Sequence, residues 1–321
     1  MEKDTDSFNR REMAQKLSLR VFDQLIKQYR SKQPFKVEAS FLKALGTVIQ
    51  DKKMDPAFKA MMLQLPPNAV LAQEQAVLDS EAFHEARKFL RTSIAAANKD
   101  ALMEIYKQFH GHEAKSQNAK SFGHRMLKNQ ALSYLSVSED PAILELVAKQ
   151  YKDAQNMTDR ITSLNILANT ESPLRQQALD DFYQTWKEDT LVINKWLTAQ
   201  AYSSRPSTLA DVKALTKHPA FNIENPNNIY SLLRAFGDNL VRFHDPAQET
   251  YSFYADMILE IDAKNAQVAA RLCSAFNFVK KLNPTLKARA TKEVQRILAT
   301  PTLSKNSREL LEKTMADVTV A

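Results

Sequence analysis

Glycine and cysteine are scarce in this sequence. Only 4 of the 321 residues are glycine and only 1 is cysteine, whereas average usage would place about 22 glycines in a chain of this length. Alternation of β-branched or aromatic residues with polar ones is also hard to find, so the composition favours helices almost throughout. The single thiol excludes an intrachain disulfide and a thiolate metal cluster. Because Cys273 lies among apolar neighbours in AARLCSAF, we expect a buried structural thiol.

Long hydrophobic runs are absent as well. A membrane span needs about 18 or more consecutive apolar residues, and no window of the sequence approaches that length. The first residues, MEKDTDSFNRREM, lack the apolar core that a secretory signal requires. We therefore expect a soluble, cytoplasmic chain with no membrane partner.

The charge is positive overall but finely mixed. The formal net charge is +7 and the isoelectric point is about 9.2. Lysines and arginines alternate with acids in stretches such as EAFHEARKFLR and KARATKEVQR. Nucleic-acid-binding chains instead gather basic residues in a block or a stripe. This pattern predicts no nucleic-acid partner.

Zinc-peptidase chemistry would need two histidines four residues apart on one helix, with a glutamate beside the first. The sequence starts this motif twice and completes it neither time. In HEARK, residues 84–88, the second ligand position holds Lys88, and in HEAKS, residues 112–116, it holds Ser116. A phosphate-cradling glycine loop and a G-x-S-x-G motif are missing too. We expect no catalytic residue and no metal ligand in this chain.

The stretch HGHE holds two histidines that could share a metal ion. His110 and His112 are separated only by Gly111, and glycine commonly ends helices because it tolerates left-handed backbone angles. We therefore expect Gly111 to mark the end of a helix at a loop.

Hydrophobic periodicity predicts helices along the whole chain. The clearest stripe lies within residues 8–31, with Ser7 as the expected N-cap. Its apolar residues recur at repeated fours: Met13, Leu17, Val21, Leu25 and Tyr29. Further helices are expected at residues 38–51, 55–64, 81–96, 98–109, 117–136, 140–152, 158–169, 174–187, 191–202, 206–216, 227–236, 247–262, 265–281, 285–298 and 303–317.

Most of these helices are short and joined by only a few residues. Helices of this length are marginal alone, so each must bury its apolar stripe against its neighbours. The predicted fold class is therefore all-α, an irregular α-superhelix or solenoid of short antiparallel helix pairs. We expect one domain over residues 1–321, with its concave surface as the place for function.

A polar cluster at residues 154–160, AQNMTDR, stands directly before apolar residues spaced like the inner face of a helix. Thr158 can cap free N–H groups, and Asp159 lies near the positive end of the helix dipole. The local interpretation is a helix start. The segment also resembles the A-x-N-M-T-D segment in the C-terminal domain of bacterial aminopeptidase N, the zinc-dependent alanyl aminopeptidase family.

Three further segments resemble the same family in the same order. LVINKWLTAQA at 191–201 is similar to its L-V-x-x-K-W-x-x-x-Q-A stretch, NPNNIYSLLRAF at 225–236 to N-P-N-R-x-R-S-L-x-x-x-F, and NAQVAAR at 265–271 to N-P-Q-V-A-x-R. The early stretch SFNRREMAQKLSLRV resembles the entry to that domain. The resemblance covers essentially the whole chain.

This resemblance implies an all-helical bowl that caps a thermolysin-like catalytic domain and encloses the active-site chamber. In that family the zinc motif and the segment that grips the substrate's amino terminus belong to preceding domains. The chain is therefore expected to be non-catalytic and to hold no cofactor, while zinc is bound by the catalytic domain of the intact enzyme. The implied partners are the N-terminal catalytic domains of the same enzyme and short peptide substrates.

Three residues match family positions on the leaving-group side of the chamber. The resemblance implies that Gln267 and Arg271 hold peptide carbonyls or a terminal carboxylate, and a helix over 265–281 would place both on one face. Tyr230 occupies a position where the family has arginine, and Asn228 replaces another. Tyr230 could still donate a hydrogen bond or stack, but it would attract a carboxylate less.

Simpler interpretations stay open. Arg271 could pair with an acid on a neighbouring helix. Trp186 and Trp196 are expected to anchor the core, and Asn225 and Asn227 to act in a cap and a turn. For the whole chain, the alternative function is a freestanding helical-repeat scaffold that binds a peptide or an acidic protein partner in its concavity.

Overall fold

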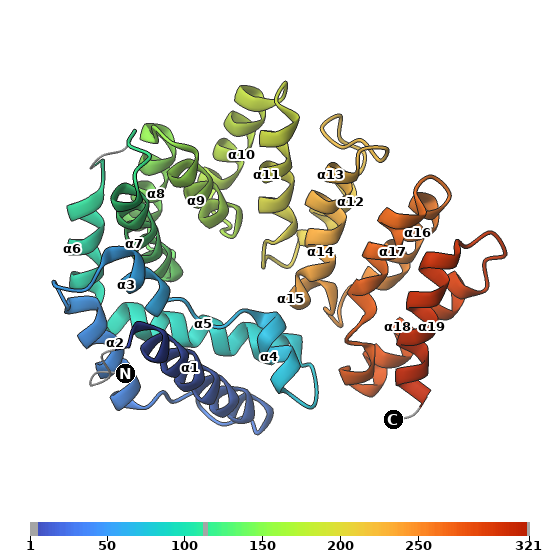
Figure 1. The fold of residues 1–321 in the computed structure, drawn as a ribbon, viewed down its shortest axis with the longest axis horizontal. Helices are drawn as coiled ribbons and strands as arrows, with labels where there is room; N and C mark the ends of the chain where they lie inside the picture. Colours follow the sequence, from blue (N-terminus) through green and yellow to red (C-terminus); the bar gives the residue numbers. More distant parts are fainter. Residues whose placement is uncertain (1–5, 112–114, 320–321) are drawn as a thin grey trace. The chain divides into compact units, whose positions relative to one another are not determined.

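The structure, a computed structural model, describes residues 6–111 and 115–319. Within these ranges the regular elements are α-helices and short 3-10 or π turns, and the only β contact is an isolated parallel bridge between Leu78 and Leu282 (Figure 1). The predicted all-α class is confirmed. No helix in these ranges is long and apolar enough to span a bilayer.

The helices follow one another with short connections. The first are α1 (Ser7–Arg30), α2 (Ala39–Gln50), α3 (Pro56–Met62), α4 (Asn68–Glu74), α5 (Ser80–Ala97), α6 (Lys99–Phe109), α7 (Ala119–Leu135), α8 (Pro141–Asp153) and α9 (Met157–Ala168). The later ones are α10 (Pro173–Trp186), α11 (Thr190–Ala201), α12 (Thr208–Leu215), α13 (Pro226–Ile229), α14 (Ala235–Asp238), α15 (Leu240–Phe243), α16 (Thr250–Asp262), α17 (Ala266–Cys273), α18 (Pro284–Leu298) and α19 (Lys305–Thr319).

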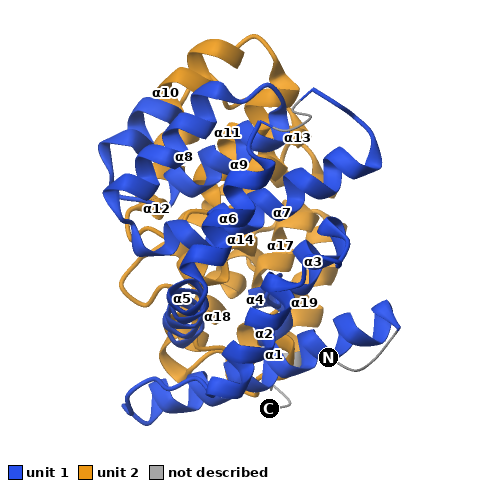
Figure 2. Cartoon of the chain, turned by 90° about the vertical axis from the view of Figure 1, so that its left-hand side faces the viewer, with its two compact units in different colours: residues 1–71, 82–178 blue, residues 72–81, 179–321 orange. Residues whose placement is uncertain are grey.

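Contacts divide the chain into two compact units, which Figure 2 shows in different colours. Unit 1 contains residues 1–71 and 82–178, and unit 2 contains residues 72–81 and 179–321. Neither unit is continuous in sequence, because a short segment from the first half of the chain packs with the C-terminal part. The structure divides the chain into these two units, and one domain over residues 1–321 stays a prediction.

Helix α1 shows how the expected stripes are used in unit 1. Phe22 and Leu25 are fully buried on its inner face. The side chain of Asp6 accepts a hydrogen bond from Asn9 N at 3.0 Å, so Asp6 is the N-cap and Ser7 is the first helical residue. The predicted cap at Ser7 is wrong by one residue, since the carboxylate before it also interacts favourably with the helix dipole.

The AQNMTDR segment does start a helix, but with another cap than predicted. Asn156 is the N-cap of α9, and its side chain accepts a hydrogen bond from Asp159 N at 2.9 Å. Thr158 lies inside the first turn. Asp159 is buried and forms an ion pair with the buried Lys128 of α7 at 2.7 Å, while Asn129 donates to it at 2.9 Å. Of the polar residues in this segment, Asp159 therefore belongs to the core and Asn156 to the helix cap.

The predicted helix over 265–281 is wrong in its second half. Helix α17 ends at Cys273, and two 3-10 turns follow at Ser274–Phe276 and Val279–Lys281. Phe276 and Val279 are both fully buried. A tighter turn changes the direction of successive side chains, which lets both reach the core. Helices α4 and α15 were not predicted.

The core of unit 2 contains a group of aromatic rings. Phe243 lies with its centroid 4.9 Å from that of Tyr254 and 5.8 Å from that of Phe276, both edge to face. Cys273, three residues before Phe276 in sequence, is also buried, and burial raises the pKa of its thiol to about 12. The predicted structural thiol is confirmed. Trp196 is also a core residue and donates its indole N–H to Leu179 O at 2.9 Å.

A lysine fixes the segment 72–81 in unit 2. The Nζ of Lys281 donates hydrogen bonds to the carbonyls of Ala72, Gln73 and Gln75 at 2.8, 2.7 and 3.0 Å. The carbonyl of Lys281 accepts in turn from Leu78 N at 2.7 Å. Some of these carbonyls belong to the last turn of α4, where a helix leaves acceptors without intrahelical donors. A single side chain therefore satisfies the end of that helix.

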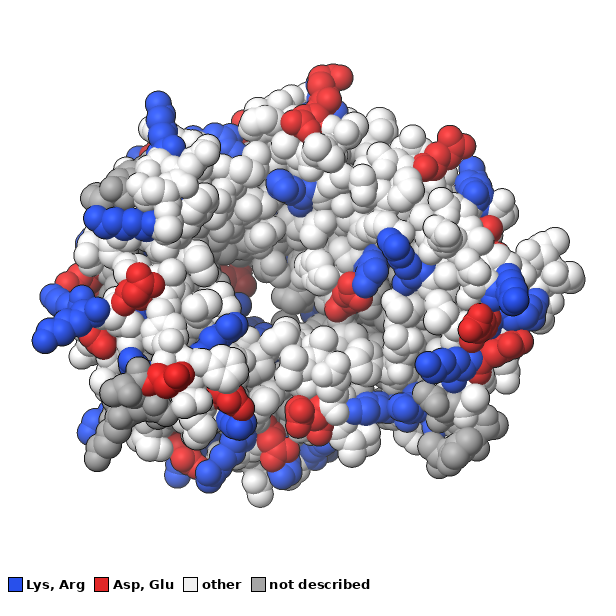
Figure 3. All heavy atoms as spheres, viewed as in Figure 1, with Lys and Arg blue, Asp and Glu red and all other residues white. Residues whose placement is uncertain are grey.

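Charges on the surface are mixed, as the sequence predicts. On the face drawn in Figure 3, lysine and arginine side chains lie among aspartate and glutamate side chains. Part of this mixing comes from pairs four residues apart on helix α1, Lys16 with Glu12 and Lys27 with Asp23, each at 2.7 Å. The absence of a nucleic-acid partner stays a prediction.

Candidate functional site

Helix α17 presents two of the three predicted site residues outward. Its N-cap is Asn265, whose side chain accepts from Val268 N at 3.1 Å. Val268 and Leu272 lie on the buried face, and Gln267 and Arg271 are exposed. Because residues four apart share a helix face, the two polar side chains lie one above the other. The prediction that Gln267 and Arg271 share one helix face is confirmed, although helix α17 is shorter than the predicted helix over 265–281.

Tyr230 meets Arg271 from a different element. The Nη1 of Arg271 donates a hydrogen bond to the hydroxyl of Tyr230 at 3.0 Å, and its Cζ lies 5.4 Å from the centre of the tyrosine ring. These positions are 41 residues apart in sequence. We call Tyr230, Gln267 and Arg271 the candidate surface.

Tyr230 begins a π turn, not an α-helical one. Residues Tyr230–Arg234 form this turn between α13 and α14. Wider turns of this kind leave carbonyls out of register with the α ladder and are frequent at functional sites. Here the hydroxyl of Thr198 donates to Ser231 O at 3.0 Å, and Leu232 and Leu233 are fully buried. The backbone that carries Tyr230 is therefore anchored on both sides.

The acid partner considered for Arg271 is not found. Among the described residues, no carboxylate lies within ion-pair distance of Arg271, and the side chain of Gln267 makes no hydrogen bond. The neutral phenol of Tyr230 takes the place of the acid. The candidate surface thus exposes a full positive charge and an amide, the two groups that hold carboxylates and peptide carbonyls.

A second polar group lies on the same run of turns. Arg234, at the end of the π turn, approaches Asp238 with 3.6 Å between Nε and Oδ2. Burial raises the pKa of Asp238 although Arg234 opposes this, and burial together with Asp238 raises the pKa of Tyr202. This arginine is paired, so its charge is largely cancelled. Sequence reasoning did not single out this group, although the spacing Tyr230, Arg234, Asp238 is visible in the sequence.

Asn228 and Asn225 have structural roles in the described fold. Asn228 is buried, accepts from Asn222 N at 3.0 Å and donates to the side chain of Asn194 at 2.7 Å. Asn225 is the N-cap of α13 and accepts from Asn227 N at 3.0 Å. The predicted cap is confirmed. Asn228 faces the interior, so it is not available where the family pattern has an arginine.

The histidine motifs offer no metal centre in the part of the chain that the structure describes. No group of three or more His, Cys, Asp or Glu side chains there could hold a metal ion. The Nε2 of His84 and the Oε1 of Glu85 lie 3.9 Å apart, and both side chains are partly exposed. Helix α6 ends at Phe109 and Gly111 has a φ of 74°, which confirms the predicted helix end. His112 and Glu113 lie outside the described residues.

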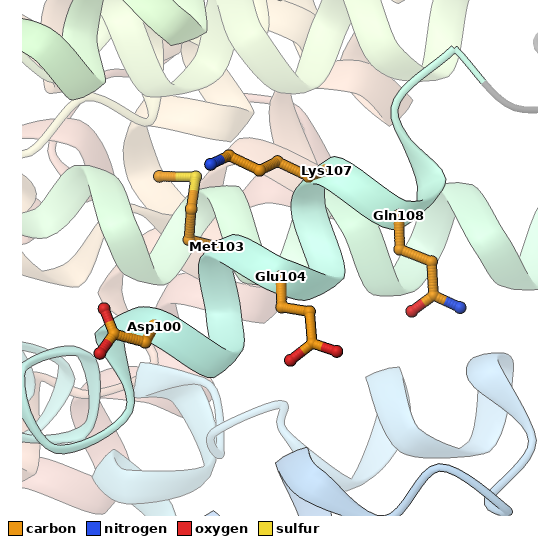
Figure 4. Close-up of a pocket in the computed structure, with 5 residues that line it drawn as sticks. All are labelled: Asp100, Met103, Glu104, Lys107 and Gln108. Carbon is orange, nitrogen blue, oxygen red and sulfur yellow. The ribbon is translucent and has the colours of Figure 1, made fainter.

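A surface depression of about 560 Å³ lies elsewhere, in unit 1. Figure 4 shows that its lining side chains all project from helix α6. They are Asp100, Met103, Glu104, Lys107 and Gln108. Glu104 is also paired with Lys52 at 3.2 Å. Polar groups from several elements normally converge on a ligand site, so this depression is a weaker candidate than the candidate surface.

The sequence profile of one protein family matches residues 1–316, and its description is "Domain of unknown function (DUF3458_C) ARM repeats". The chain belongs to this family of ARM-repeat domains. The repeat description agrees with the predicted solenoid of helix pairs. The resemblance to the C-terminal domain of bacterial aminopeptidase N is confirmed by the relatives of this ARM-repeat domain.

Two curated relatives and one solved structure show how far the similarity extends. Aminopeptidase N from Caulobacter vibrioides is 36% identical over 314 residues, which cover 97% of this chain and 36% of that protein. Aminopeptidase N from Escherichia coli K12 is 28% identical over 312 residues, with the same two shares. A crystal structure of Legionella pneumophila aminopeptidase A in complex with aspartic acid matches with a TM-score of 0.87 and 25% identity, covering 98% of this chain and 37% of that one. The ARM-repeat chain thus spans just over a third of these relatives.

Proposed function

We propose that this ARM-repeat chain is the non-catalytic C-terminal domain of a zinc-dependent aminopeptidase. In the intact enzyme it caps the active-site chamber, controls which substrates enter, and contacts the part of a peptide that leaves after cleavage. The names of its relatives support the enzyme class. The observation that carries the residue assignment is the exposed Arg271 guanidinium, held by Tyr230 and unpaired with any described acid.

The described residues do not fit a zinc site, so no step of the reaction is assigned to this chain. In such an enzyme the bound zinc, held by the catalytic domain, polarises the scissile carbonyl and activates water. The contribution of this chain is binding. Contacts to remote parts of a substrate improve the position of the reacting bond and can raise its rate of cleavage.

The expected chemistry of the candidate surface follows from its donors. The guanidinium of Arg271 offers N–H groups in a planar fork that matches a carboxylate or two carbonyl oxygens. The amide of Gln267, one turn earlier on α17, can both donate and accept. Together they suit the backbone of a short extended peptide.

The cytoplasmic location stays a prediction from the sequence.

The test replaces Arg271 in the full-length polypeptide that contains this chain. For Arg271→Ala we expect kcat/KM on tripeptides and tetrapeptides to fall at least about tenfold, because hydrogen bonds to charged groups contribute about 1.5–3 kcal/mol. Hydrolysis of a single-residue arylamide should be unchanged. Lys292→Ala removes a positive charge that is also exposed, on α18, and is the matched control. Equal losses on both substrate types would refute the assignment.

The alternative function, a freestanding scaffold for a peptide or an acidic protein, is separated from this proposal by the size of the native polypeptide. An antibody raised against the chain, which has a mass of 36.5 kDa, can be used on an immunoblot of source cells. A band well above that mass supports the aminopeptidase domain. A single band at that mass favours the scaffold.

A further inference from the structure

Arg271 differs from the other arginines of unit 2 in what its guanidinium contacts. Five of them reach an acid: Arg205 with Asp211 at 3.0 Å, Arg234 with Asp238 at 3.6 Å, Arg242 with Asp245 at 2.9 Å, Arg289 with Glu249 at 3.3 Å and Arg296 with Asp256 at 2.8 Å. Arg308 donates to the carbonyls of Leu298 and Thr300. The side chain of Arg271 contacts a neutral phenol.

The contact with Tyr230 fixes the guanidinium without cancelling its charge. One of its five N–H groups is used in the 3.0 Å hydrogen bond, and the ring supplies a second contact through its electron-rich face. A carboxylate in place of Tyr230 would hold Arg271 equally well but would neutralise it. A leucine or phenylalanine would leave the charge but lose the hydrogen bond. Only a neutral acceptor both restrains the arginine and leaves it able to attract an anion.

The backbone under Tyr230 supports this role. The π turn Tyr230–Arg234 is held from below by the buried Leu232 and Leu233 and from the side by the bond from Thr198 to Ser231 O at 3.0 Å. A side chain projecting from an anchored turn restricts the rotamers of the residue that it contacts. Ordering a long side chain costs conformational entropy, so an arginine restrained beforehand loses less when it binds.

We propose that Tyr230 is a positioning residue: it orients the guanidinium of Arg271 without pairing its charge with an acid, so that the candidate surface prefers peptides with a free carboxylate in their leaving part. This proposal rests on the proposed function, because it requires that Arg271 contacts the peptide. It also changes the expected role of Tyr230, from a direct peptide contact to a residue that acts through Arg271. Arg234, four residues further on, is already paired with Asp238 and serves as an internal comparison.

The experiment uses matched tripeptides that differ only in their C-terminal group, a free carboxylate or an amide, with the full-length polypeptide. For Tyr230→Phe we expect KM for the free-carboxylate peptide to rise about fivefold, because an unrestrained Arg271 must lose its rotamer freedom when it binds the peptide. Its kcat should stay unchanged, and KM for the amide peptide, whose carbonyls Arg271 can also contact, should rise less. The ratio of kcat/KM of the free-carboxylate peptide to that of the amide peptide therefore falls relative to the unmodified enzyme.

Tyr230→Glu separates positioning from simple contact. A glutamate would hold Arg271 and cancel its charge, so the preference for the free carboxylate should fall further than in Tyr230→Phe. Arg234→Ala should leave the preference unchanged. If Tyr230→Glu does not fold, as judged by its circular dichroism melting curve, the ratio measured for Tyr230→Phe decides alone.

The outcomes separate this proposal from the function on which it rests. If Arg271→Ala changes peptide and arylamide cleavage equally, the proposed function fails and this proposal fails with it. If Arg271→Ala selectively impairs peptides while Tyr230→Phe leaves the carboxylate preference intact, only the positioning role is overturned. An equal rise in KM for the free acid and the amide in Tyr230→Phe would also overturn it, because it would show a contact that does not depend on the carboxylate.

Discussion

Asp159 and Arg271 both come from sequence segments that resemble the same family, and their surroundings differ completely. In unit 1, Lys128 and Asp159 pair at 2.7 Å with side chains only 1% and 8% exposed. In unit 2, Arg271 is exposed and bonded to a neutral tyrosine. Lys128 and Asp159 pair their charges inside the fold, whereas the charge of Arg271 is not paired with an acid among the described residues. A family-like segment can therefore mark either the core or a binding surface.

The buried pair also sits in a wider hydrogen-bond network. Gln150 of α8 donates to Asn129 at 3.0 Å and to Ser163 at 3.1 Å, and Asn129 donates to Asp159. Three helices of unit 1 are joined in this way. Polar networks of this kind specify one arrangement of the core most strongly when every member is satisfied, and here Gln150 Oε1 has no hydrogen-bond partner among the described residues. No comparable network surrounds Arg271 among the described residues, which is the difference that substitutions can measure.

The largest expected effect is on the buried pair. Lys128→Met keeps most of the side-chain volume but leaves Asp159 buried without its cation, which costs about 3–5 kcal/mol. The free energy of unfolding from urea denaturation of the chain should fall by this amount. Lys149→Met breaks the exposed pair of Lys149 with Asp153 at 2.5 Å and should have no measurable effect. Equal stability of the two variants would mean that the buried pair is not a structural element.

An intermediate effect is expected in the packing behind the candidate surface. A Cβ on Gly237 of α14 would lie 2.6 Å from the hydroxyl of Tyr254 and 2.9 Å from Ala275 Cβ. Gly237→Ala should therefore destabilise the chain by about 1–3 kcal/mol. Tyr254→Phe removes the clashing oxygen, which has no hydrogen-bond partner among the described residues, so the double variant should recover part of this loss. Additive effects of the two substitutions would contradict the packing explanation.

The smallest effect on stability is expected where the effect on binding is largest. Arg271→Ala removes one exposed hydrogen bond and one exposed cation–π contact, together less than about 1 kcal/mol. Its urea midpoint should lie close to that of the unmodified chain. A loss as large as that of Lys128→Met would place Arg271 among the structural residues and remove the contrast between the two groups.

Periodicity was enough to predict most of the helices, because each short helix carries its own apolar stripe. It failed where long-range packing decides the backbone. The residues after Cys273 continue a helical pattern, but burial of Phe276 against Phe243 bends them into 3-10 turns. Helix α4 was missed because it follows directly after Pro66 and Pro67, which were interpreted only as a break between helices.

The candidate site was predictable only in part. The four-residue spacing of Gln267 and Arg271 placed both on one face, and the resemblance supplied Tyr230. The contact between Tyr230 and Arg271 joins positions 41 residues apart, so neither local pattern contains it. The same holds for Lys128 and Asp159, whose segments each look like ordinary polar helix starts or faces. Whether a surface arginine is paired with an acid depends on residues that only the fold brings near.

The segment 72–81 has a consequence for the order in which the chain becomes structured during synthesis. Its carbonyl at Ala72 is bonded by Lys281, 209 residues later. At about 5–20 residues per second, a ribosome needs roughly 10–40 s to synthesise the residues between Ala72 and Lys281. Throughout this interval the segment has already been synthesised, while its lysine does not yet exist. Unit 1 can fold as soon as its own helices have been synthesised. Unit 2 needs its last third, which contains Lys281, before it can pack against the segment 72–81 that was made much earlier.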